Sequence, residues 1–151
     1  MILSPGTERR FKNAVAVGFS LFFSLAILLA AEELIRWKLR PFFGFVGGPS
    51  GRIVRYISFA AAALIILVIK SMRGRALRMR PEEDKTRFAF RLAWMTLLIM
   101  ALSVVPALLG FVLFLLFGLN IDFYILMFVS LFLVFMFFPR RSSWVDIISF
   151  Q

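Results

Sequence analysis

The longest stretch of this chain without a charged side chain is LAWMTLLIMALSVVPALLGFVLFLLFGLNI, residues 92–121. Asp122 interrupts the apolar pattern, and residues 123–139 are again free of charge. A helix of about 20 apolar residues is long enough to cross the hydrocarbon core of a bilayer. The stretch therefore predicts two transmembrane helices in succession, over residues 90–117 and 123–138.

The turn between these helices is predicted at residues 118–122, which hold the turn-forming residues of the region. Gly118 suits the position that follows a helix, and Asn120 or Asp122 suits the N-cap of the next one. A carboxylate there also complements the helix dipole. Pro106 lies inside the first helix, where it removes one backbone hydrogen bond and predicts a kink, for which packing neighbours or Ser103 can compensate.

Two further spans are predicted upstream. Residues 13–31 carry no charge, which indicates a span over about residues 13–35. Such a run is longer than the apolar region of a signal peptide, so we expect it to remain uncleaved. Residues 57–69 form a shorter run, but the basic side chains at its two ends can extend to the head groups. This run predicts a span over residues 53–72.

Composition supports this fold class, an all-α membrane protein with a bundle of four transmembrane helices in one domain over residues 1–151. Of the 151 residues, 62% are hydrophobic, whereas soluble domains have about 45–50%. The chain has no Cys and no His. These absences exclude disulfides and thiolate metal sites, together with the commonest general base and transition-metal ligand. We expect neither a cofactor nor a metal.

The basic residues predict the orientation. Four spans place both termini and the loop 70–91 on one side of the membrane, and positive charge marks the cytoplasmic side. Both termini are therefore expected to be cytoplasmic. On that side lie Arg9, Arg10, Lys12, Lys70, Arg73, Arg75, Arg78, Arg80, Lys85, Arg87, Arg91, Arg140 and Arg141, and on the other Arg36, Lys38, Arg40, Arg52 and Arg55.

The net charge of +10 is interpreted as contact with anionic lipid head groups rather than with nucleic acid. Four arginines of the central loop are the candidate lipid contacts. Two interpretations stay open: the arginines recognise an acidic lipid or partner, or they only set the topology. The tail, residues 140–151, is expected to lie on the inner surface of the membrane. The four arginines are Arg73, Arg75, Arg78 and Arg80.

The first loop combines glycines with aromatic residues, among them Phe42, Phe43 and Phe45. One interpretation is a re-entrant segment that binds a lipid or a partner subunit. The favoured interpretation is a flexible loop whose aromatic rings rest at the lipid interface.

Ionisable residues inside a membrane span are candidate functional groups. Glu32 and Glu33 close the first span, and both can pair with Arg36 at the spacings that favour helical ion pairs. A cation or proton site is one interpretation of this group, and an interfacial ion pair is the favoured one. Asp122 is interpreted as the N-cap of the fourth span, with a pore-mouth or partner contact as the alternative.

Small residues predict which helix faces meet. Ala16, Ser20 and Ser24 follow one another at four-residue spacing in the first span, with Ala14 and Gly18 beside them. We expect this face to contact other helices. Spans one to three should then form the tight interior, with span four more peripheral.

A local resemblance extends over about a quarter of the chain, residues 103–141. It is carried by PALLG at residues 106–110, Gly118, DFY at 122–124 and FPR at 138–140. These motifs resemble small bacterial inner-membrane proteins with four spans, which implies a multi-pass inner-membrane location and no particular activity. The first motif is also similar to the second helix of rotary ATPase proteolipid subunits. Those subunits have a carboxylate before the proline that is absent here, so rotor function is not implied.

Two function classes remain. The first is a non-catalytic accessory or assembly subunit of a membrane complex, whose partners are the lipid bilayer and other membrane subunits. The second is a small transporter or channel component, which needs polar groups along a path through the membrane. Catalysis is disfavoured because the chain lacks His, Cys and an acidic pair at depth. The polar residues available within the spans are Ser20, Ser24, Thr96 and Ser103.

Overall fold

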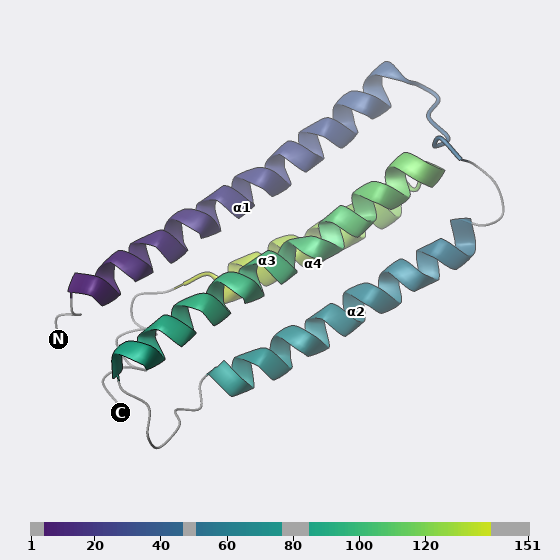
Figure 1. Ribbon diagram of the computed structural model, residues 1–151. Coiled ribbons are helices and arrows are strands. Elements are labelled where there is room, and N and C mark those ends of the chain that lie inside the picture. Colours follow the sequence, from purple (N-terminus) through teal and green to yellow (C-terminus); the bar gives the residue numbers. More distant parts are fainter. Residues whose placement is uncertain (1–4, 47–50, 77–84, 140–151) are drawn as a thin grey trace.

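The computed structural model describes residues 5–46, 51–76 and 85–139, and within these ranges every regular element is a helix. All four helices are long and apolar enough to cross a membrane, which confirms the prediction of four such segments. They run alternately up and down the molecule (Figure 1). The helices are α1 (Pro5–Lys38), α2 (Gly51–Ala76), α3 (Lys85–Phe117) and α4 (Asn120–Phe137).

The turn between α3 and α4 is tighter than predicted. Helix α3 ends at Phe117 as expected, and Gly118 follows with a φ of +67°, a conformation that glycine adopts without strain. The N-cap of α4 is Leu119, which makes no side-chain capping hydrogen bond. The prediction of a cap at Asn120 or Asp122 is therefore wrong. Two residues complete the turn, so α4 has already begun when the chain reaches Asp122.

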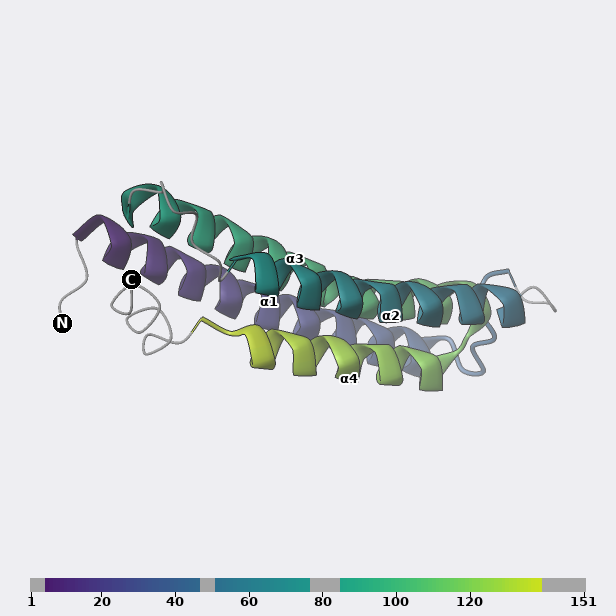
Figure 2. The same cartoon turned by 90° about the horizontal axis from the view of Figure 1, so that it is seen from below.

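Helices α3 and α4 form the central pair of the bundle, with α1 and α2 on opposite sides of it (Figures 1 and 2). Within a continuous apolar stretch of 18 residues in each helix, 50% of the residues are buried in α3 and 39% in α4, against 17% in α1 and in α2. The prediction that span four is peripheral is therefore wrong. Gly110 explains the close approach, because a Cβ there would lie 3.1 Å from the Cα of Phe123.

A hydrogen bond reinforces this central pair. Helix α3 continues through Pro106, which has no N–H and disturbs the backbone ladder. The neighbouring N–H of Ala107 donates to the Oγ of Ser130 on α4 at 2.8 Å, and both residues are fully buried. Ser103 donates instead to the Ile99 carbonyl of its own helix. Ser130 therefore compensates for the proline from the neighbouring helix.

The packing face of α1 differs from the predicted one. Ala16 and Ser20 are exposed, while Ala14 and Gly18 are buried. The Ser20 hydroxyl donates to the Ala16 carbonyl at 3.1 Å, so it needs no partner on another helix. The prediction that the Ala16 and Ser20 face contacts other helices is wrong. Small residues do pack inward, but they lie on the face that carries Gly18, where there is room for the Met100 side chain.

Candidate functional site

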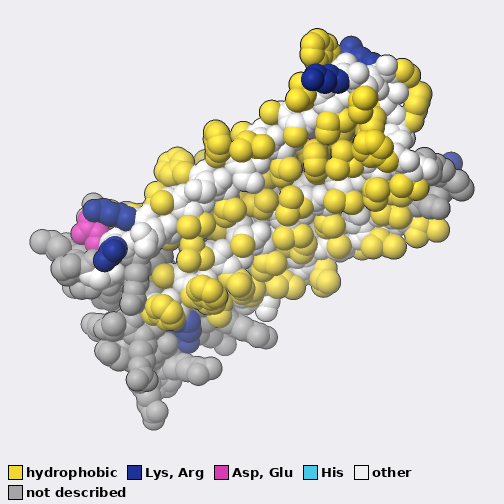
Figure 3. Space-filling view, turned by 45° about the horizontal axis from the view of Figure 1, so that its top comes forward, with side chains coloured by type: hydrophobic (Ala, Val, Ile, Leu, Met, Phe, Trp, Pro, Cys, Tyr) yellow, Lys and Arg dark blue, Asp and Glu magenta, His cyan; other side chains and the backbone are white. Residues whose placement is uncertain are grey.

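Charged side chains gather at the two ends of the bundle, and apolar side chains cover its flanks (Figure 3). One end is built by the C-terminus of α1, the N-terminus of α2 and the turn between α3 and α4 (Figure 1). Two groups of acidic and basic residues meet there, one across α1 and α4 and the other across α2 and α4. This end is the candidate functional site.

The loop after α1 covers the end of α3. The N–H groups of Phe45 and Val46 donate to the carbonyl oxygens of Leu115 and Leu116, each at 2.9 Å. These carbonyls belong to the last turn of α3 and have no partner within the helix. The loop therefore supplies the cap that the α3 terminus needs.

Two glycines allow this contact. Gly44 has a φ of +84°, and a Cβ there would lie 2.6 Å from the backbone nitrogen of Gly118. Gly118, with its own positive φ, would place a Cβ 2.8 Å from the Phe43 carbonyl carbon. The backbones cross so closely that any side chain at either position would displace the loop.

The three aromatic candidates of this loop have different environments. Phe42 packs against the buried Phe114 with ring centroids 5.0 Å apart. Phe43 and Phe45 are 75% and 71% exposed. Phe42 therefore anchors the loop to the core, and Phe43 and Phe45 remain the candidates for contact with lipid or a partner. Residues 39–46 thus cover the end of α3, joined to it by two backbone hydrogen bonds and the Phe42 ring.

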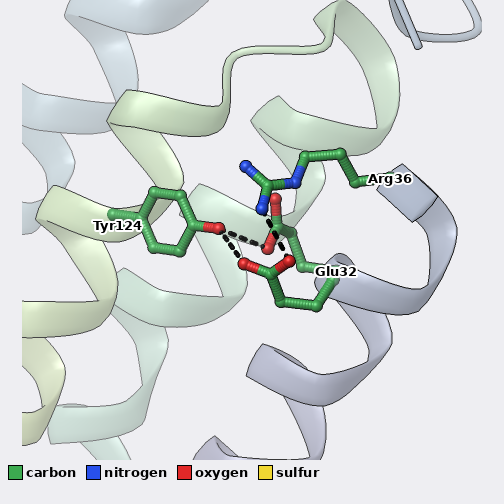
Figure 4. Close-up of polar contacts among 4 residues, drawn as sticks. Glu32, Arg36 and Tyr124 are labelled. Atoms are coloured by element: carbon green, nitrogen blue, oxygen red, sulfur yellow. Dashed lines mark hydrogen bonds and ion pairs between the residues drawn. The ribbon is translucent and has the colours of Figure 1, made fainter. Parts of the chain in front are cut away.

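The first polar group joins α1 to α4 (Figure 4). The Tyr124 hydroxyl lies 2.9 Å from Oε2 of Glu32 and 2.5 Å from Oε1 of Glu33. Arg36 donates from Nη2 to Oε2 of Glu33 at 2.6 Å. Of the two predicted pairings with Arg36, the structure forms the one with Glu33, and Glu32 contacts tyrosine instead.

Glu32 is the buried member of this group. Its exposed fraction is 0%, and its Oε1 atom has no hydrogen-bond partner. It lies on the inward face of α1, in line with Leu25, Leu28 and Ile35, which contribute to the apolar core. Glu33 is one residue further along the helix, about 100° around its axis, and its side chain is 48% exposed.

The sequence placed Tyr124 in the DFY motif but did not indicate it as a candidate site residue. A tyrosine near the start of an apolar helix is typical of the membrane interface, so its type alone does not indicate a partner. The inward face of α1 did indicate a contact, because residues at its spacing of three and four positions are apolar except for Glu32. Such a buried carboxyl needs a polar partner from a neighbouring helix.

The second polar group joins α2 to α4. Arg55 Nη2 lies 3.0 Å from Oδ1 of Asp122, whose side chain is 3% exposed. The two atoms are close, but they lack the alignment of a hydrogen bond. Asp122 thus forms an ion pair with α2 in place of the predicted N-cap hydrogen bond. Together with Tyr124, it connects the start of α4 to both flanking helices.

The candidate lipid contacts belong to the other end of the bundle. Arg73 is exposed on α2, and its guanidinium carbon lies 5.4 Å from the centroid of the Phe137 ring. Arg75 also belongs to α2. Arg78, Arg80 and the tail at residues 140–151 lie outside the described residues, so those predictions stand as they are.

No protein-family model, curated protein or solved structure matches this chain. The resemblance of residues 103–141 to small four-span bacterial proteins therefore stays a prediction. Within the described ranges, no group of three His, Cys, Asp or Glu residues is placed to hold a metal ion. The function has to be inferred from the chemistry of the bundle itself.

Proposed function

We propose that this chain is a non-catalytic integral membrane protein that serves as an accessory or assembly subunit of a membrane complex. Its four apolar helices and the apolar band between two charged ends support insertion in a bilayer (Figure 3). The proposed location is the bacterial inner membrane, and the proposed contacts are anionic lipids and other membrane subunits.

The observation that carries this proposal is the use of the hydroxyl groups along the four helices. Ser20, Thr96 and Ser103 each donate to a carbonyl four residues earlier in the same helix. The Ser130 hydroxyl accepts the Ala107 N–H. A transport path needs polar groups that can contact a solute. These hydroxyls form hydrogen bonds with helix backbones instead. Apolar clusters fill the space between the central helices.

The proposed orientation has both termini in the cytoplasm. The start of α1, the end of α2, the start of α3 and the end of α4 meet at one end of the bundle (Figure 1). Exposed basic residues stand there, and positive charge near a span marks the cytoplasmic side. These residues are Arg9, Lys12, Lys70 and Arg73.

Purification of the tagged protein in mild detergent, with identification of co-purifying membrane proteins, tests the proposal. An accessory subunit should bring down a defined partner in constant proportion. An unrelated four-span protein with the same tag and expression level serves as the control. A protein that purifies alone from cross-linked native membranes would contradict the proposed role.

The second candidate function is a transporter or channel component, and the burial of Glu32 favours it. A coupling carboxylate lies away from bulk water, and Glu32 is fully buried. The double substitution Glu32→Gln, Glu33→Gln separates the two candidates in a complementation assay of a deletion strain. An accessory subunit should retain its cellular phenotype. Loss of complementation at normal expression would favour transport.

A further inference from the structure

The charges around Glu32 do not balance. Arg36 pairs with Glu33, and the side chain that Glu32 contacts by a hydrogen bond is the neutral Tyr124. Arg40 is exposed, and no ion pair joins it to Glu32 among the described residues. Helix α3 contributes no charged side chain between residues 92 and 117. Within the group that these contacts join, Glu32, Glu33 and Arg36 sum to one negative charge if both carboxyl groups are ionised.

That charge would fall on a buried group. An ionised carboxylate without a counter-ion or full hydrogen bonding is strongly unfavourable in an apolar environment, and neutralisation by a proton relieves the cost. Glu32 meets these conditions, because it is fully buried and its Oε1 atom has no partner. A neutral carboxyl group with an unpartnered carbonyl oxygen costs far less than an unpartnered carboxylate.

The hydrogen bonds also need one more proton. Tyr124 has one hydroxyl proton, yet its oxygen lies within hydrogen-bond distance of both glutamates. A proton on Oε2 of Glu32 completes the set. Glu32 then donates to the Tyr124 oxygen, Tyr124 donates to Oε1 of Glu33, and Arg36 donates to Oε2 of Glu33.

We propose that Glu32 binds a proton and exchanges it with water through Tyr124 and Glu33. In the exchange, the Glu32 proton passes to the Tyr124 oxygen while the tyrosine proton passes to Oε1 of Glu33. Glu33 releases that proton to water, and tyrosine stays neutral throughout. A proton taken up by Glu33 reverses both transfers.

The site opens toward one end of the bundle. Glu33 is 48% exposed in its side chain and connects the chain of hydrogen bonds to water. On the inward side of Glu32, the next residues of its face are Leu28 and Leu25, which pack with Phe114 in the apolar core. Protons therefore reach Glu32 from that end without crossing the molecule. The inference goes beyond the proposed accessory role and does not depend on it.

Infrared spectroscopy of the protein in lipid nanodiscs tests the proposal directly. A protonated carboxyl group has its own carbonyl stretching band, distinct from those of a carboxylate. We expect this band at neutral pH in the unsubstituted protein and its loss in Glu32→Gln. Asp122→Asn is the matched control, because Asp122 is a buried carboxylate paired with Arg55, and this variant should keep the band.

Tyr124→Phe provides a second readout with Glu32 intact. Without its acceptor, the Glu32 carboxyl band should shift to higher frequency, and its exchange in heavy water should slow. This variant tests the protonation of Glu32 if Glu32→Gln fails to fold. The proposal is overturned if the unsubstituted protein shows no such band at neutral pH. Persistence of the band in folded Glu32→Gln, or an unchanged frequency in Tyr124→Phe, would also overturn it.

Discussion

At the scale of the residue, one step along α1 separates two carboxyl groups into different environments. Glu33 faces the surface and pairs with Arg36, while Glu32 faces the core and meets Tyr124. The spacing of three residues predicted the first contact, because it depends on helix geometry alone. The second contact depends on how α1 and α4 are rotated against each other across 92 positions of sequence. A local sequence pattern therefore does not predict how the two helices are rotated against each other.

Ser130 offers a test of the contact that stabilises the central helix pair. Ser130→Ala removes the acceptor of the buried Ala107 N–H. Interhelical hydrogen bonds in membrane proteins contribute about 0.6 kcal/mol on average and up to about 1.7 kcal/mol. We expect a loss of stability in this range, measured by thermal unfolding in detergent. Ser20→Ala is the control, because its exposed hydroxyl bonds within α1; an equal loss in both variants would contradict the assignment.

Gly18 offers a test of the inward face of α1. Even a Cβ at this position would lie 2.6 Å from Met100 Cε and 2.8 Å from Phe138 Cε2. Gly18→Leu should therefore overpack the bundle and cost about 1–3 kcal/mol. Ser20→Leu adds a similar side chain on the exposed face and should change stability by no more than about 0.5 kcal/mol. A larger effect of Ser20→Leu in detergent unfolding would restore the face expected from the sequence.

At the scale of the element, apolar length predicted the helices well and small-residue spacing predicted their contacts poorly. Each predicted span lies within a helix or overlaps it almost entirely, because the absence of charge over about 20 residues is a local property. The regular spacing of Ala16, Ser20 and Ser24 was misleading, since a serine can satisfy its hydroxyl within its own helix. The central role of α4 follows from Gly110 and Ser130, which act through partners on another helix.

The cover on the end of α3 can be tested at Gly44. Its positive φ costs a residue with a Cβ about 1–2 kcal/mol, and the nearby backbone of Gly118 leaves no room. Gly44→Ala should therefore lower the unfolding temperature and speed hydrogen exchange at the Phe45 and Val46 amides. Gly74→Ala is the matched control, because nothing lies within 4 Å of its Cβ position. That change within α2 should raise stability by about 0.5–1 kcal/mol.

At the scale of the whole molecule, basic side chains are exposed at both ends of the bundle, and the ends differ in the polar contacts between helices. At one end, the hydrogen bonds of Tyr124 and the Arg55–Asp122 ion pair connect both flanking helices to the start of α4. The opposite end, called the basic end below, exposes Arg9, Lys12, Lys70 and Arg73, and Lys12 pairs there with Glu8. If the basic end faces the cytoplasm, the proton site at Glu32 faces the other compartment. The orientation in the membrane therefore decides from which side of the membrane Glu32 takes up its proton.

Single cysteines test that orientation. The chain has no Cys, so an introduced thiol is labelled without background. Val46 is 64% exposed at the end that carries Glu32, and Gly74 is exposed at the basic end. In intact cells, Val46→Cys should react with a membrane-impermeant thiol reagent and Gly74→Cys should react after the membrane is opened. The positive-inside asymmetry is the reason for this expectation. The reverse labelling pattern would invert the topology and place the proton site on the cytoplasmic side.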